Sequence, residues 1–319
     1  MSKGFWKKLK KPILAMAPMA NVTNMAFRQI VASCGKPDVF WTEFVSIDGL
    51  CSVGRERLMK DLRFSDKERP IVAQFFGKDP QKFVVAVKLA KKMKFDGIDI
   101  NMGCPDKKII KQGAGADLIL NAKLAKKIIL TVKKAAGSLP VSVKTRIGYG
   151  KYDKEEFKKW LEVLLSARPD VITVHGRTRK MMYTGVADWE AIKFAVEIVK
   201  NYNKKNKTDI LILGNGDVKD LKDAYEKIAL SGVDGIMVGR NVLNNPWFFY
   251  KKSKKISPID RKKILLKHLT LFSKIEKGGD FNSLKKYFKS YLSGFKNAKS
   301  LRIKLMNAKS SGEVRKILK

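Results

Sequence analysis

The chain has 319 residues, of which 45% are hydrophobic, so it can form one large domain, or a domain of about 250 residues with a smaller one. It carries 67 basic and 30 acidic residues, a net charge of +37, which favours polyanionic partners, nucleic acid first and an acidic membrane surface second. Lysine outnumbers arginine 54 to 13, and AT-rich coding explains that ratio but not the scarcity of acids. The hydrophobic content of 45% excludes a disordered basic tail protein.

The first twenty residues, MSKGFWKKLKKPILAMAPMA, imitate a signal peptide. Their apolar run is short and is cut by Pro18, so Ile13–Ala17 is better explained as a first core strand. No run approaches the roughly 20 apolar residues that span a bilayer. The three cysteines, Cys34, Cys51 and Cys104, fit neither a disulfide framework nor a zinc pattern. We expect a cytoplasmic protein without metal or membrane contact, and a monomer.

Along the first 250 residues, short apolar runs alternate with amphipathic stretches. The runs predict strands over Ile13–Ala17, Val39–Thr42, Ile71–Phe76, Gly97–Asn101, Val141–Arg146, Val171–His175, Ile210–Leu213 and Gly235–Val238. The amphipathic stretches predict helices over Asn24–Cys34, Gln81–Met93, Ala122–Ala136, Asp153–Ala167, Asp188–Lys200 and Val218–Leu230. Eight such units predict a closed (β/α)8 TIM barrel, with a doubly wound open sheet as the alternative. The polar segment Asn201–Lys207 is expected to be a solvated loop.

Beyond residue 252 the pattern becomes purely helical. Apolar residues at helical spacing predict helices over Arg261–Ile275, Phe281–Leu292, Phe295–Asn307 and Gly312–Leu318. Residues 251–319 hold 21 basic and 4 acidic residues, whereas residues 1–250 hold 46 and 26. We therefore predict a barrel over residues 1–252 and a basic all-α helical bundle over residues 253–319 that contacts a polyanion. The alternative for the bundle is an ordinary solvated helical face.

The main indication of a functional site is the stretch GIDINMGCPDKKIIKQGAGADL, residues 97–118. Pro105 cannot donate to a sheet ladder, so the strand ends before it and Cys104 lies on the following loop. In parallel α/β folds this end of a strand carries the chemistry. With Asn101, Lys107 and Lys108 nearby, the loop suggests a site for a polar, anionic substrate. A small buried cysteine in a Gly/Pro turn is the alternative.

Other strand ends carry further candidates. Lys144 and Arg146 are two residues apart and hence share a face of their strand, and His175 ends the next strand. Glycine turns after the last two strands, at Asn215-Gly216-Asp217 and Gly239-Arg240, match the phosphate site that TIM barrels place there. By contrast, Gly113-Ala114-Gly115 lacks the context of a dinucleotide fingerprint and is expected to lead into a helix.

Eight strings in order carry a family resemblance: APMANVTN, TEFVSIDGL, QFFG, DINMGCPDKKIIKQGAGADL, VSVKTRIG, HGRTRKMMYTGVADW, LGNGDV and MVGRNVLNNPW. They resemble the ordered motifs of the tRNA-dihydrouridine synthases, and the basic helical tail is similar to that family's RNA-binding domain. The NMGCP form is closest to the bacterial branch. The resemblance implies an FMN-dependent oxidoreductase that reduces the C5=C6 bond of uridines in tRNA, with NADPH or NADH as a transient reductant.

The resemblance also implies roles for individual residues. Cys104 would be the general acid that protonates C5 of the uracil. Contacts with FMN would come from Pro18, Met19, Ala20, Gln74, Lys144, His175, Asn215, Gly216, Asp217, Gly239 and Arg240. Contacts with the uridine and the rest of the tRNA would come from Asn101, Lys108, Arg146, Arg177 and Arg179.

Two functions from other classes stay open from the residues themselves. One is an FMN-dependent oxidoreductase acting on a small molecule of the dihydropyrimidine type, against which the basic tail and the HGRTR string argue. The other is a non-catalytic tRNA-binding protein or chaperone that has kept the fold.

Overall fold

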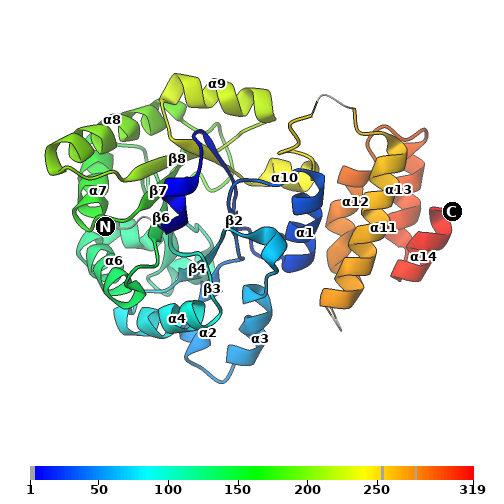
Figure 1. Cartoon of the computed structure of the whole chain (residues 1–319), viewed down its shortest axis with the longest axis horizontal. Helices are drawn as coiled ribbons and strands as arrows, with labels where there is room; N and C mark the ends of the chain where they lie inside the picture. The colour runs from blue at the N-terminus through cyan, green and yellow to red at the C-terminus, as the bar shows by residue number, and fades with distance from the viewer. Residues whose placement is uncertain (1–3, 253–254, 277–278) are drawn as a thin grey trace.

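The structure is a computed structural model, and it describes residues 4–252, 255–276 and 279–319. In these residues a barrel is followed by a group of helices at one side (Figure 1). The predicted domain boundary between residues 252 and 253 adjoins residues 253–254, which lie outside the described ranges.

The barrel is a parallel sheet in the order β1-β9-β8-β7-β6-β5-β4-β2, with the short β3 paired to β4. An isolated parallel bridge between Ala15 and Val39 joins the two ends of this order and closes the barrel. The predicted TIM barrel is therefore confirmed, and the open sheet is excluded. The strands are β1 (Ile13–Met16), β2 (Phe40–Trp41), β3 (Val45–Ser46), β4 (Ile71–Phe76), β5 (Gly97–Met102), β6 (Val141–Arg146), β7 (Val171–His175), β8 (Leu211–Asn215) and β9 (Gly235–Val238).

Helices surround the sheet, and most follow the strand before them directly. They are α1 (Met25–Cys34), α2 (Ile47–Leu50), α3 (Arg55–Met59), α4 (Pro80–Lys92), α5 (Lys107–Ile110), α6 (Ala122–Ala136), α7 (Lys154–Ser166), α8 (Trp189–Asn206), α9 (Leu221–Ser231) and α10 (Arg240–Asn244). The 3₁₀ helices are η1 (Gly4–Lys8), η2 (Lys60–Leu62), η3 (Asp66–Glu68) and η4 (Gly115–Leu120). The loop expected over Asn201–Lys207 is wrong, because α8 continues to Asn206.

The N-terminal segment covers one end of the barrel. Trp6 of η1 is 3% exposed and packs with Trp41, whose ring centroid lies 5.9 Å away. Trp6 belongs to the same apolar cluster as Ile13 and Val72, which lie at the amino ends of β1 and β4. The N-terminal segment thus closes the amino end of the barrel, so the carboxyl end of the strands is the one that can hold a ligand.

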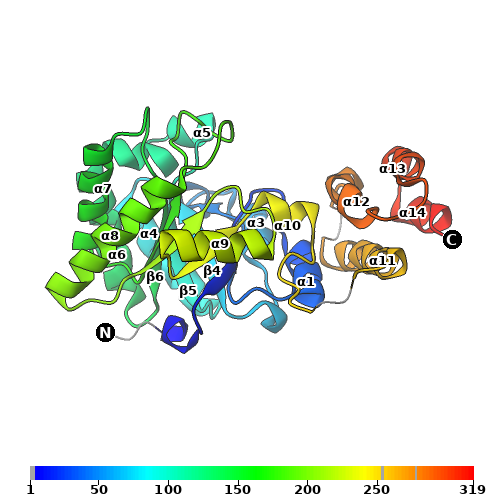
Figure 2. The same ribbon diagram turned by 90° about the horizontal axis from the view of Figure 1, so that it is seen from above.

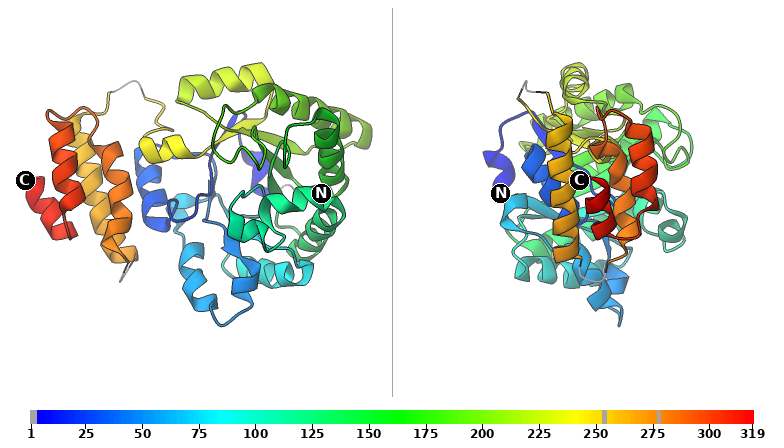
Figure 3. Two further views of the ribbon diagram at one scale, coloured as in Figure 1. Left: turned by 180° about the vertical axis from the view of Figure 1, so that it is seen from behind. Right: turned by 90° about the vertical axis from the view of Figure 1, so that its right-hand side faces the viewer.

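The C-terminal helices are α11 (Pro258–Ile275), η5 (Phe281–Leu284), α12 (Lys285–Tyr291), α13 (Ala298–Asn307) and α14 (Ser311–Ile317). They form a bundle beside α1, as Figures 2 and 3 show. Leu269 of α11 and Phe27 of α1 belong to one buried cluster, and the Phe27 and Tyr287 rings lie 4.6 Å apart. The predicted helical bundle is confirmed, and it shares its core with the barrel.

Among the described residues, no helix is both long and apolar enough to cross a membrane.

Candidate functional site

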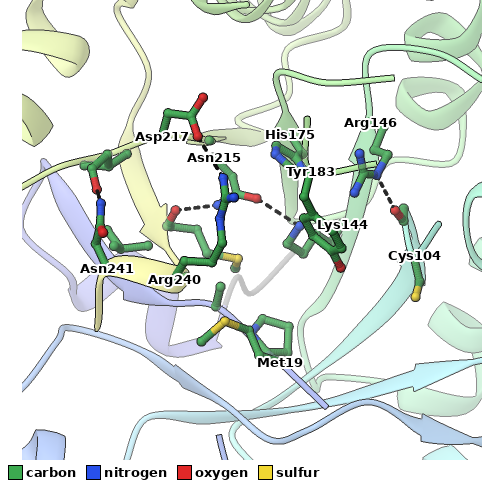
Figure 4. Close-up of a pocket in the computed structure, with 18 of the residues that line it drawn as sticks. Met19, Cys104, Lys144, Arg146, His175, Tyr183, Asn215, Asp217, Arg240 and Asn241 are labelled. Carbon is green, nitrogen blue, oxygen red and sulfur yellow. Dashed lines mark hydrogen bonds and ion pairs between the residues drawn. The ribbon is translucent and has the colours of Figure 1, made fainter. Parts of the chain in front are cut away.

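A pocket of about 430 Å³ opens at the carboxyl ends of the barrel strands. Its walls combine apolar groups, such as Met19 and Met237, with a group of polar and charged side chains. Figure 4 shows the polar group, with Lys144 and His175 between Arg240 on one side and Cys104 on the other. The pocket therefore combines apolar walls with polar and charged side chains that extend from Arg240 to Cys104.

Lys144 places a half-buried amine at the centre of the pocket. It lies on β6, and its Nζ donates to Oδ1 of Asn215 on β8 at 3.1 Å. Asn215 is itself fixed, since its Nδ2 donates to the carbonyl of Met237 at 2.7 Å. Burial, assisted by the charge of Arg146, lowers the pKa of Lys144 to about 8. The ammonium still has donor capacity for an oxygen or anionic ligand.

His175 ends β7 next to Lys144 and is 8% exposed. Burial, together with the charges of Lys144 and Arg146, holds the pKa of His175 well below its usual range. The imidazole is therefore neutral at neutral pH and presents one donor and one acceptor nitrogen. Its Nε2 lies 3.4 Å from Nη1 of Arg177.

Cys104 lies on the loop after β5, as the sequence predicts. Burial raises the pKa of its thiol above the ordinary value, so the thiol stays protonated at neutral pH. Arg146 supports this loop because its Nε donates to the carbonyl of Gly103 at 2.6 Å. The same guanidinium donates to the carbonyls of Thr178 and Met182, at 2.9 Å each, and so joins two loops across the pocket.

The turn after β8 carries an arginine-carboxylate arrangement. Asp217 accepts from Nη2 of Arg177 at 2.5 Å and from Nη2 of Arg240 at 2.8 Å. Arg240 is half exposed at the rim, whereas Arg177 is 2% exposed. Gly216 has a φ of +133°, and a Cβ there would lie 2.6 Å from the Cβ of Ala187. Only glycine fits this turn, which brings backbone groups close to any bound ligand.

The structure brings together most of the predicted residues. Those that line the pocket are Pro18, Met19, Gln74, Asn101, Cys104, Lys144, Arg146, His175, Asn215, Gly216, Asp217, Gly239 and Arg240. Four lie outside its lining: Ala20, Lys108, Arg177 and Arg179. Ala20 and Lys108 are exposed on the surface. Arg177 is buried, and it donates to the carbonyls of Thr184 and Gly185 at 3.0 and 2.7 Å.

The sequence reasoning missed two aromatic rings of the pocket, Phe44 and Tyr183. Tyr183 lies on the loop after β7, and the guanidinium carbons of Arg146 and Arg240 each lie 5.8 Å from its ring centroid. A tyrosine next to two methionines in an otherwise polar stretch was the available signal. Asn241 was also missed as a pocket residue, although it lies within one of the quoted strings.

Fold and pocket together define the class: a (β/α)8 barrel with a charged, partly apolar ligand pocket at its carboxyl end. The family model described as "Dihydrouridine synthase (Dus)" matches residues 15–319. A probable tRNA-dihydrouridine synthase of Staphylococcus aureus (strain COL) is 39% identical over 322 residues, covering 100% of this chain and 95% of its own length. A probable tRNA-dihydrouridine synthase 2 of Bacillus subtilis (strain 168) is 38% identical, covering 100% and 96%. The chain belongs to the dihydrouridine synthase family.

Solved structures support the fold. A 2-naphthoyl-CoA reductase in complex with 2-naphthoyl-CoA superposes with a TM-score of 0.55 at 12% identity, covering 75% of this chain and 49% of that one. A morphinone reductase mutant in complex with tetrahydroNAD superposes with a TM-score of 0.52 at 10% identity, covering 75% and 86%. At such identities the likeness concerns the barrel alone.

Proposed function

We propose that the protein is a tRNA-dihydrouridine synthase, an oxidoreductase that reduces the C5=C6 bond of a uridine in tRNA. Family membership over residues 15–319 gives the reaction class. The observation that carries the proposal for this chain is the placement of a protonated thiol, Cys104, in the same pocket as the half-buried amine of Lys144. A reduction of this kind needs both a proton donor and a group that stabilises negative charge.

The pocket suits an FMN cofactor. Met19, Met237 and Val238 offer an apolar surface for a planar ring, and Lys144 offers a hydrogen-bond donor to its polar edge. Arg240 and the turn at Gly216 offer a cation and close backbone approach for a phosphate. We assign the remaining cofactor contacts to Pro18, Gln74, His175, Asn215, Asp217 and Gly239, all of which line the pocket.

Bound FMN, once reduced by NADPH or NADH, would supply the hydride for C6 of the uracil. Cys104 then donates the thiol proton at C5, and the uracil thereby gains two hydrogens across the C5=C6 bond. Burial keeps this proton on the sulfur at neutral pH. Asn101 and Arg146, which line the pocket, would orient the base, and Tyr183 would contribute a ring surface beside it.

The target nucleotide must leave its stack to reach the pocket, which costs a few kcal/mol. Phosphate contacts from the basic surface would offset this cost. We propose residues 1–252 as the catalytic domain and residues 253–319 as the tRNA-binding domain, on the basis of the tail's 21 basic and 4 acidic residues. Lys108 and Arg179 would contact RNA directly, whereas the buried Arg177 would act through the loop that it holds.

The test is NADPH oxidation with tRNA that lacks dihydrouridine, followed by mass spectrometry of the digested product. The wild type should form dihydrouridine, and Cys104→Ala should lose it by roughly 100-fold or more while keeping flavin and tRNA binding. Cys51→Ala is the matched control, because Cys51 is exposed and lies outside the pocket lining. A flavin-loaded wild type without tRNA-dependent product would instead favour a small-molecule oxidoreductase, and turnover unchanged in Cys104→Ala would remove the proposed acid.

A further inference from the structure

A chain of hydrogen-bonded polar side chains runs through the barrel interior below Cys104. Ser142 of β6 donates to Oδ1 of Asp99 on β5, and Nε2 of Gln74 on β4 donates to Oδ2 of Asp99 at 2.6 Å. Nδ2 of Asn101 then donates to Oε1 of Gln74 at 3.0 Å. Ser142, Asp99 and Gln74 are at most 1% exposed, and Asn101 is 5% exposed. Asp99 does not line the pocket, and its hydrogen bonds reach the pocket through Gln74 and Asn101.

This series of hydrogen-bonded side chains ends on the backbone of the Cys104 loop. Oδ1 of Asn101 accepts from the backbone N–H groups of Gly103, at 3.1 Å, and of Cys104, at 2.9 Å. On the other side, the carbonyl of Cys104 accepts from the N–H of Ala116 at 3.0 Å. Arg146 holds the carbonyl of Gly103, whereas the N–H groups of Gly103 and Cys104 both depend on the amide oxygen of Asn101, whose orientation decides whether the contact is attractive.

The direction of every hydrogen bond in this series of side chains follows from Asp99. A carboxylate only accepts hydrogen bonds, so Gln74 must turn its NH2 group toward Asp99 and its oxygen toward Asn101. Asn101 must then turn its NH2 group toward Gln74, which leaves its oxygen for the two backbone N–H groups. If Gln74 turned over, Asn101 would follow, and its NH2 group would face the N–H groups of Gly103 and Cys104, which is repulsive.

We propose that Asp99 is a positioning residue for the reaction: acting through Gln74 and Asn101, it fixes the loop that presents the Cys104 thiol to the substrate. This inference rests on the proposed function in taking Cys104 as the proton donor. A displacement of about 1 Å at a reacting group is enough to slow catalysis by roughly 100-fold. Asp99 would thereby control a proton transfer without touching substrate or cofactor.

The test uses Asp99→Leu, which has a similar shape but no acceptor. The flavin-loaded protein is treated with iodoacetamide, and labelling of each cysteine is followed by peptide mass spectrometry. We expect Cys104 to be labelled several-fold faster than in the wild type, because its loop loosens, while kcat for tRNA reduction falls by about tenfold or more and KM for tRNA stays within about twofold. The buried Cys34 and the exposed Cys51 are internal controls whose labelling stays unchanged.

A double variant, Asp99→Asn/Gln74→Glu, restores the direction of the chain without a carboxylate at position 99. The amide introduced at position 99 would donate to the carboxylate introduced at position 74. That carboxylate accepts from Asn101 as the amide oxygen of Gln74 does, so Asn101 keeps its oxygen toward Gly103 and Cys104. We expect Cys104 labelling close to that of the wild type. Because Gln74 lines the pocket, labelling and not turnover is the measurement for this variant.

Labelling of Cys104 at the wild-type rate in Asp99→Leu would overturn the inference, as would fast labelling in the double variant. If Asp99→Leu exposes Cys34 as well, the fold has been lost and the double variant decides: a folded protein with protected Cys104 supports the inference, and any other result overturns it. These labelling results do not depend on turnover. A wild type that makes no dihydrouridine would therefore count against the proposed function and leave the role of Asp99 in the loop separately measurable.

Discussion

Glu43 is a buried carboxyl group beside the joint between the barrel and the helical bundle. Its Oε1 accepts from the N–H of Val22 at 2.9 Å, and the carbonyl of Val22 accepts from the hydroxyl of Tyr287 at 2.5 Å. Burial, with the charge of Asp61 adding to it, raises the pKa of Glu43 from 4.5 to about 7. The folded chain thus binds this proton more tightly than the unfolded chain. The resulting stabilisation is complete below pH 4.5 and is lost as the pH rises through 7.

Glu43→Gln should remove this pH dependence, because the amide keeps an oxygen for Val22 and carries no charge. Between pH 5 and pH 8 the stability of the variant relative to the wild type should rise by roughly 2 kcal/mol, as measured by urea unfolding. Glu226→Gln on α9, where the side chain is 58% exposed, serves as the control and should show no such rise. A difference between Glu43→Gln and the wild type that stays constant across this range would contradict the assignment.

The candidate site was predictable at the strand ends and in the residues that directly follow them, such as Cys104, and was not predictable in the longer loop after β7. The ends of β6, β7 and β8 place Lys144, His175 and Asn215 at one rim because parallel strands end together. The position of Tyr183 depends on tertiary contacts, since the loop that carries it is held by Arg146 and Arg177. The same contacts bury Arg177, which local sequence alone does not reveal.

At the scale of elements, α1 links the barrel to the bundle and is anchored by a buried ion pair. Nε of Arg28 donates to Glu68 at 2.5 Å, and both side chains are 0% exposed. The remaining guanidinium nitrogens donate to the carbonyls of Thr23 and Arg63, at 2.6 Å each. Because each guanidinium nitrogen of Arg28 donates a hydrogen bond, the ion pair fixes η3 against α1. α1 is also the helix on which α11 packs.

Glu68→Gln should therefore destabilise the protein by about 3–5 kcal/mol in urea unfolding, because it leaves the buried Arg28 without its counter-charge. Asp66→Asn in the same 3₁₀ helix is a matched control. The Asp66 side chain is 93% exposed in its ion pair with Arg69, so its loss should cost less than about 1 kcal/mol. Equal effects of the two substitutions would show that the buried pair does not anchor α1.

Elements with strong apolar periodicity were predicted well, and those set by capping contacts were not. β4, β6, β7 and β9 have the predicted bounds, since short runs rich in β-branched residues favour buried strands. The polar end of α8 was predicted as a loop. It stays helical because Asn203 accepts from the N–H of Ile210 at 3.0 Å and donates to its carbonyl at 2.9 Å, which fixes the chain where it leaves the helix. Such a contact spans seven residues and leaves no periodic signal.

At the scale of the whole molecule, charge is distributed unevenly along an elongated body. The bundle lies at one end, with α13 on its outer side, and α6 lies toward the opposite end (Figure 1). Residues 251–319 carry +17 in 69 residues, from 21 basic and 4 acidic side chains. A folded tRNA presents phosphates over a distance larger than a single pocket, so a second basic surface away from the pocket would add both affinity and orientation.

If the bundle binds tRNA, removing three exposed charges of α13, in the variant Lys299→Gln/Arg302→Gln/Lys304→Gln, should weaken binding by lost phosphate contacts. The magnitude of the negative slope of log K against log salt concentration should fall by roughly 2, since each phosphate contact contributes about 0.7–0.9 to it. Removing three charges from α6, in Lys126→Gln/Lys127→Gln/Lys134→Gln, lowers the net charge equally and should leave the slope nearly unchanged. Filter binding over a salt series measures both. If both variants lost the same salt dependence, the overall charge of the protein would explain tRNA binding. A specific contact surface instead predicts that only the α13 charges, which lie on that surface, change the salt dependence.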